Sequence, residues 1–174
     1  MCIRDRLLEC AAQAQVPAAV FDTDDPRFLT PGDIPARVAA WYTERGLPAP
    51  VDRPTMVRAI VESLAAAFAD SVRTAEELAA VPVSVVHIVG GGSQNGLLCQ
   101  LTADRLGLPL VAGPVEATAL GNVLLTARAQ TLISGDLEAL RAVVAEHHPT
   151  HRYVPRSRRE SSSERTAGLG SLRR

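Results

Sequence analysis

The chain has 174 residues, of which 47% are hydrophobic and 21% charged, which is enough for one globular domain with a real core. A formal net charge of −1 excludes the overall basic field that recruits nucleic acid. No apolar run approaches the ~18 residues of a membrane span, and the N-terminus lacks the order of a signal peptide. The three cysteines, an odd number without regular spacing, argue against a disulfide framework, so we expect a reducing, cytoplasmic setting.

The sequence pattern predicts three helices in the first half of the chain. They cover Leu7 to Val16, Asp33 to Gly46, and Pro54 to about Ala80. Residues 1–6 are charged and unpatterned, and we interpret them as foreign to the domain. Asp33 is placed to cap the second helix. A capping box at residues 74–77 leaves two alternatives open for the third: one continuous helix, or a break near Thr74.

Two groups of possible metal ligands are interpreted as surface side chains, and no metal site is predicted. The aspartates between positions 22 and 25 lie in a turn-rich run without the glycine and glutamate of an EF-hand. The histidines between positions 147 and 151 lie near the C-terminal tail without cysteines or convincing acidic partners. His87 lies within an expected strand and is interpreted as a core or edge residue.

The stretch from Val83 to Asn95 predicts a strand, a glycine turn and a helix. β-branched apolar residues at 84–89 predict a buried strand, Gly90, Gly91 and Gly92 end it, and a helix is expected from Gln94. Glycines let the main chain approach a ligand closely, and the unpaired N–H groups of a helix's first turn favour anions. The pattern indicates a nucleotide or phosphate contact at these glycines, with a purely structural tight turn as the alternative.

Two standard phosphate-binding motifs do not fit this stretch. The dinucleotide fingerprint requires a third glycine where Asn95 stands, and no acidic residue ends the next expected strand. The P-loop requires Lys followed by Ser or Thr after Gly96, where the sequence has Leu97 and Leu98. Any nucleotide contact therefore belongs to another class of site.

The second half of the chain predicts few strands for an α/β protein. The expected elements are a strand at 108–112, a helix from Glu116 to Gln130, and a last helix that begins at Asp136. The strands at 84–89 and 108–112 should pair in parallel through a right-handed crossover. Two strands leave a parallel sheet truncated, so we interpret the chain as part of a larger α/β domain. Residues 156–174, rich in Arg and Ser, are expected to be a disordered tail.

Several segments together resemble the C-terminal lobe of the FGGY carbohydrate kinases, in the rhamnulokinase branch. They are Val-His-Ile-Val-Gly-Gly-Gly-Ser-Gln-Asn at 86–95, Gln-Leu-Thr-Ala-Asp at 100–104, Ala-Gly-Pro-Val-Glu-Ala-Thr-Ala-Leu-Gly-Asn at 112–122, and upstream segments at 24–33 and 56–65. The resemblance runs from about Leu7 to Pro155. It implies a helix-rich, incomplete lobe of an actin-like, ribonuclease H-like ATPase fold with a truncated parallel sheet.

The resemblance also implies a reaction. These enzymes transfer the γ-phosphoryl group of ATP to the 1-hydroxyl of L-rhamnulose with Mg²⁺. Gly91 matches the family's ATP-contacting glycine, Gly90 and Gly92 shape the turn, and Asn95 at the helix start approaches the nucleotide. Glu116 opens the next helix and is interpreted as structural.

The resemblance further implies that the catalytic parts lie elsewhere. The family's phosphate loop, sugar contacts and catalytic aspartate lie upstream of Leu7, so no catalytic residue and no Mg²⁺ ligand is predicted here, and the chain alone should be inactive. ATP or ADP is the expected partner, and L-rhamnulose only through that missing part, with no nucleic acid and no membrane. The alternatives are a stand-alone nucleotide-binding or regulatory module, a nonfunctional interaction segment, or part of another FGGY sugar kinase.

Overall fold

The computed structural model describes residues 3–156, and these form two compact units, one ending at Pro82 and the other beginning at Val83. Residues 157–174, which belong to the tail predicted to be disordered, lie outside the described residues. Within residues 3–156, no helix combines the length and the hydropathy that crossing a bilayer requires.

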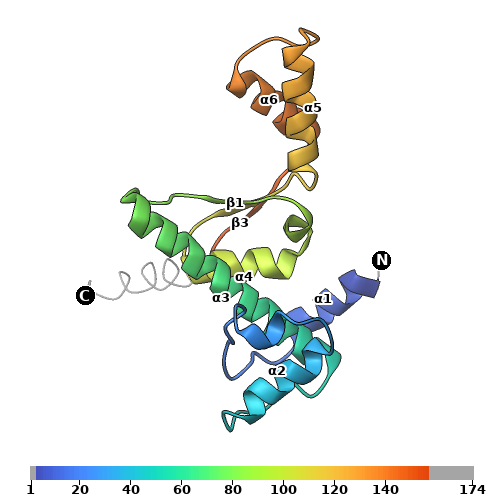
Figure 1. Ribbon diagram of the computed structural model, residues 1–174, viewed down its shortest axis with the longest axis vertical. Helices are drawn as coiled ribbons and strands as arrows, with labels where there is room; N and C mark the ends of the chain where they lie inside the picture. Colours follow the sequence, from blue (N-terminus) through green and yellow to red (C-terminus); the bar gives the residue numbers. More distant parts are fainter. Residues whose placement is uncertain (1–2, 157–174) are drawn as a thin grey trace, which may run out of the picture. The chain divides into compact units, whose positions relative to one another are not determined.

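The first unit is built from helices (Figure 1). They are α1 (Ile3–Gln13), the short 3₁₀ helix η1 (Pro26–Phe28), α2 (Ile34–Thr43) and α3 (Arg53–Ala79). Asp33 caps α2 as predicted, since its side chain accepts a hydrogen bond from the N–H of Ala36. The continuous alternative for α3 is correct, and the helix starts at a capping box between Asp52 and Thr55. Helix α1 begins four residues earlier than predicted, so part of the start interpreted as unpatterned is helical.

The core of the first unit gathers aromatic side chains of low exposure around α2 and α3. Its buried members are Phe21, Val38, Trp41, Tyr42 and Ala59.

A second buried contact joins α1 to α3. The guanidinium of Arg58 pairs with Glu62 one turn away at 2.8 Å and donates to the carbonyl of Ala12 at 3.1 Å, which satisfies part of the C-terminal end of α1.

The second unit contains the glycine turn. Its elements are β1 (Val86–Ile88), η2 (Gly91–Gln94), α4 (Gly96–Leu106), β2 (Leu110–Ala112), α5 (Ala117–Ala129), α6 (Leu137–His147) and β3 (His151–Tyr153). The three strands form one sheet in the order β1-β2-β3. Strands β1 and β2 pair in parallel with Val86 opposite Leu110, as predicted. Strand β3 pairs with β2 in the antiparallel sense, so the sheet is mixed and the predicted all-parallel sheet is corrected.

One face of the sheet is covered by α4, and the hydrophobic core of the second unit lies between them (Figure 1). The buried side chains there are Cys99 and Ala103 from α4 and Leu110 and Ala112 from β2. The first strand is shorter and less buried than predicted. It covers 86–88 rather than 84–89, and Val89 is 50% exposed. Strand β1 pairs only with β2 among the described residues, which accounts for this half-exposure.

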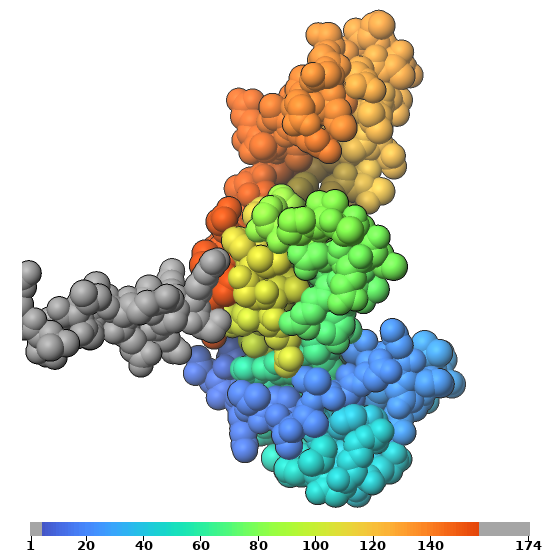
Figure 2. Space-filling model, turned by 90° about the vertical axis from the view of Figure 1, so that its left-hand side faces the viewer, coloured from blue at the N-terminus to red at the C-terminus, as the bar shows by residue number. Residues whose placement is uncertain are grey.

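Strand β3 is fastened to α4 by side-chain hydrogen bonds. The Gln100 amide donates to the carbonyl of Val154 at 3.0 Å, and Asp104 accepts from the N–H of Arg156 at 2.8 Å. In the space-filling view, the atoms of this last segment lie directly against those of α4 and β2 (Figure 2). The end of the described chain therefore packs against α4, the helix that follows the glycine turn.

Candidate functional site

The glycine turn begins with a backbone conformation that favours glycine. Gly90 has φ 77° and ψ −165°, a region that side chains with a Cβ rarely adopt. Its N–H donates to the carbonyl of Pro114 at 3.2 Å, and the N–H of Gly113 donates to the carbonyl of Ile88 at 2.8 Å. These bonds join the carboxyl ends of β1 and β2, the edge at which α/β sheets usually bind ligands.

Gly91 differs from Gly90 because packing does not explain it. A Cβ built on Gly91 would meet no atom of the described residues within 4 Å, and its φ lies outside the left-handed region. A Cβ on Gly92 would make an ordinary contact with Ile88 at 3.7 Å. The backbone conformation therefore accounts for glycine at position 90, and the open side of Gly91 leaves room for a ligand beside its main chain.

Helix α4 begins at Gly96, two residues later than predicted, because Asn95 is its N-cap. The Oδ1 atom of Asn95 accepts the N–H of Leu98 at 3.1 Å. Residues 91–94 form the 3₁₀ turn η2 instead of the first turn of the helix. Asn95 is thus at the helix start as predicted, and its Oδ1 atom is engaged in the cap.

Two residues that sequence reasoning did not assign to the site hold the turn in place. The hydroxyl of Ser93 donates to the carbonyl of Gly90 at 2.7 Å, which closes the turn from inside. The thiol of Cys99 is fully buried, 3.8 Å from the carbonyl oxygen of Gly92 and 3.9 Å from that of Ser93. Burial raises the pKa of this thiol to about 11. A serine three residues after a turn glycine was the available signal for the first contact.

A groove adjoins the turn. It has a volume of about 440 Å³, and its lining includes Ser93 and Gln94 from η2 and the loop from Ala112 to Glu116. Neither the three glycines nor Asn95 lines the groove itself, so the predicted contact residues lie on its border. The groove opens at the carboxyl ends of the two parallel strands, where a nucleotide contacting the turn would extend.

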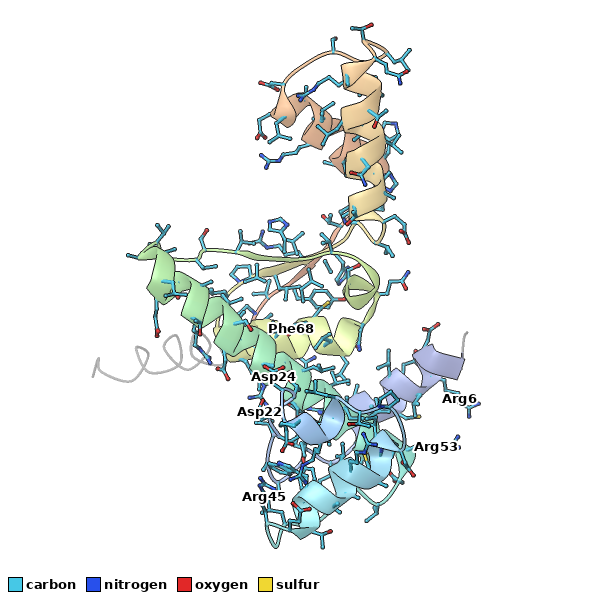
Figure 3. The ribbon with its side chains drawn as sticks, viewed as in Figure 1. Arg6, Asp22, Asp24, Arg45, Arg53 and Phe68 are labelled. Atoms are coloured by element: carbon cyan, nitrogen blue, oxygen red, sulfur yellow. The ribbon has the colours of Figure 1, made fainter. Side chains whose placement is uncertain are left out.

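The other polar groups singled out in the sequence do not gather at the turn. Asp22 and Asp24 belong to the first unit, where Asp22 accepts the N–H of Asp24 at 2.9 Å within their own loop (Figure 3). Asp25 accepts the N–H of Arg27 at 2.9 Å. His87 is exposed on β1, in agreement with the edge interpretation. In residues 3–156 no three His, Cys, Asp or Glu side chains come together as a metal site would require.

A comparison with family models defines the class of protein. Residues 4–130 match the FGGY family of carbohydrate kinases, C-terminal domain, which is well over half of the chain. The chain therefore belongs to the FGGY family of carbohydrate kinases, as its motifs predicted. The helix-rich, incomplete lobe expected from those motifs agrees with this membership, except that its sheet is mixed.

Several similar curated relatives carry the name rhamnulokinase. One from Pectobacterium carotovorum subsp. carotovorum (strain PC1) is 38% identical over 151 residues, which is 87% of this chain and 30% of that protein. One from Bacteroides thetaiotaomicron is 35% identical over 79% of this chain and 28% of that protein. One from Klebsiella pneumoniae (strain 342) is 44% identical over 65% of this chain and 24% of that protein. The chain thus spans less than a third of each relative.

Among solved structures, the xylulose kinase from Rhodospirillum rubrum matches with a TM-score of 0.43 and 23% sequence identity. The match covers 68% of this chain and 25% of that chain.

Proposed function

We propose that this chain is the nucleotide-contacting C-terminal part of an ATP-dependent kinase that phosphorylates L-rhamnulose at O1 in rhamnose breakdown. Membership of the FGGY family supports an ATP-dependent sugar kinase. The choice of L-rhamnulose is supported by the name of relatives at 35–44% identity. Another sugar of the same family is the alternative, since the segments that contact the sugar lie outside the matched part. A cytoplasmic location fits this role.

The observation that carries the proposal is the open main chain at Gly91. No contact of the described residues requires glycine there, whereas the close approach of a phosphate group does. In the proposed complex the α- and β-phosphates of ATP or ADP lie against the main chain of Gly90, Gly91 and Gly92. Asn95 presents Nδ2 beside them while Oδ1 stays in the helix cap. Gly91 is the contact residue, and Gly90 and Gly92 give the turn its shape.

Phosphoryl transfer requires more than this part. Catalysis depends on a phosphate loop, a base for the sugar hydroxyl and Mg²⁺ ligands held in one cleft. The relatives are more than three times as long as their matched segments, and we assign these parts to the remainder of such a protein. Mg²⁺, when bound with ATP, neutralises charge on the phosphates. The residues described here bind and orient the nucleotide, and by themselves transfer nothing. A stand-alone nucleotide-binding module is the alternative function.

Calorimetric titration of the 174-residue chain with ATP tests the assignment of the site. We expect measurable binding by the natural chain and at least a tenfold loss in Gly91→Val, because the valine side chain would occupy the space of the phosphates. Gly121→Val is the matched control, since Gly121 in α5 also has open space and an ordinary φ. Equal ATP affinity in Gly91→Val and the natural chain would remove Gly91 from the site.

A further inference from the structure

The groove beside the glycine turn has a second wall that comes from the far end of the described chain. Polar side chains from three segments line it: Ser93, Gln94, Glu116, His148, Thr150 and His151. The last three belong to residues 148–151, which are the connection after α6 together with the first residue of β3, and we call this segment the α6–β3 loop. More than fifty residues separate this loop from the turn in the sequence, and the sheet brings them together.

The α6–β3 loop is held firmly against the glycine-rich edge of the sheet. At one end, the N–H of His148 donates to the carbonyl of Val144 at 2.9 Å, which terminates α6. At the other end, His151 pairs with Ala112 at the start of β3. Between them, a Cβ on Gly113 would lie 3.6 Å from the carbonyl oxygen of Pro149. The pairing of His151 with Ala112 and the close approach of Pro149 to Gly113 therefore place this wall beside the carboxyl end of β2.

The chemistry of the groove suits an uncharged polar ligand better than a phosphate. The carboxylate of Glu116 repels phosphate groups but accepts hydrogen bonds from hydroxyl and amino groups. The Thr150 hydroxyl, the Gln94 amide and the two imidazoles can both donate and accept. A volume of about 440 Å³ lies within the range of pockets that hold small molecules. Ribose and a nucleobase carry the hydroxyl and amino groups that such a lining recognises.

We propose that His148 and Thr150 contact the nucleoside of the nucleotide whose phosphates lie on the glycine turn. This inference rests on the proposed function, because it uses the turn as the phosphate site. Ser93 and Gln94 follow Gly92 directly in the same 3₁₀ turn, so a nucleotide held there by its phosphates reaches the groove without crossing the sheet. The α6–β3 loop then contributes to nucleotide affinity from the side opposite η2.

Amide chemical shifts of the 174-residue chain, titrated separately with ADP, adenosine and inorganic pyrophosphate, test this directly. We expect ADP to shift the amides of both the glycine turn and the α6–β3 loop. Adenosine should shift Thr150 and His148, whereas pyrophosphate should shift only Gly91 and Gly92. In parallel, His148→Ala and Thr150→Ala should each weaken ADP binding roughly three- to tenfold, the effect of one lost hydrogen bond.

The neighbouring His147→Ala is the matched control. Its ring is exposed, bonds to the carbonyl of Val143 at 2.9 Å and does not line the groove. ADP shifts at the turn with none in the α6–β3 loop would overturn this inference and leave the phosphate site standing. ADP shifts in the loop with none at the turn would overturn the phosphate site. No response to ADP in either place would overturn both, and equal losses in the His147 and His148 variants would remove the role of His148.

Discussion

The sulfur of Cys99 lies 3.8 Å from the carbonyl oxygen of Gly92, so the glycine turn rests directly on the core of its unit. Cys99 is completely buried and packs with Ala103 and Leu110 between α4 and the sheet. Cys99, a small apolar residue, thus supports from the core the main chain that we assign to phosphate binding. A rigid backing of this kind keeps the turn in one conformation.

Cys99 should be almost unreactive in the folded chain. Burial disfavours the thiolate and raises its pKa from 9.0 to about 11, so little thiolate exists at neutral pH. The double variant Cys2→Ser/Cys10→Ser leaves Cys99 as the single thiol. We expect its reaction with a disulfide reagent to be slow until denaturant is added. Labelling of the native variant as fast as that of the exposed Cys10 in the natural chain would contradict the burial.

The same thiol gives a direction for stability against pH. The unfolded chain loses the Cys99 proton near pH 9, whereas the folded chain holds it to about pH 11. The folded state therefore binds more protons in that window, and this contribution to the free energy of unfolding is complete below pH 9 and lost as the pH rises to 11. Urea unfolding across this range should show a smaller fall in Cys99→Ala than in the natural chain.

The same substitution should lower the free energy of unfolding much more at Gly90 than at Gly91. Gly90→Ala forces a Cβ into φ 77° and should lower the free energy of unfolding by about 1–2 kcal/mol. Gly91→Ala adds a Cβ in open space and should change it by less than about 1 kcal/mol in either direction. Chemical denaturation of both variants checks this, and equal losses would show that Gly91 is also required by the fold.

The buried pair of Arg58 and Glu62 should be strongly coupled in the first unit. Glu62→Leu leaves the guanidinium buried without its carboxylate partner and should cost about 3 kcal/mol of unfolding free energy. The double variant Arg58→Met/Glu62→Leu should recover much of that loss, because both charges are removed together. Denaturation of the two single variants and the double variant measures the coupling, and strict additivity would refute it.

The purified chain should show no sugar-kinase turnover. Relatives named rhamnulokinase extend well beyond the matched part. Our proposal gives the residues described here a binding role and assigns the chemical step to the remainder of such a protein. A coupled assay of ADP release with ATP, Mg²⁺ and L-rhamnulose should stay at the blank rate, while a full-length relative gives turnover under the same conditions. Release above the blank that scales with chain concentration would contradict the assignment of catalysis to other segments.

Local sequence signals predicted the fold at some positions where one residue decides the backbone. Asp33 was predicted to cap a helix, and its side chain caps α2. The parallel pairing of β1 and β2 followed from the strand-helix-strand order. Strand β3 escaped prediction because His151–Tyr153 is short and polar, and its pairing with Leu110 is a long-range contact that no local pattern records.

Local signals in the sequence pointed to the glycine turn of the candidate site but not to the groove beside it. The three glycines and Asn95 lie within one short stretch of the sequence, residues 90–95. Helix α4 starts at Gly96, later than predicted, because Asn95 is its N-cap. What distinguishes Gly91 from Gly90 is the space around each Cβ position, which depends on tertiary packing. The wall at residues 148–151 is distant from the turn in the sequence. Local pattern therefore indicates only surface histidines there.

A crystal structure of the 174-residue chain with ADP tests the central claim most directly. We predict that the phosphates of ADP lie against the main chain of Gly90, Gly91 and Gly92, at the carboxyl ends of β1 and β2. ADP bound with its phosphates at any other place on the chain, leaving this turn without a ligand, would contradict it.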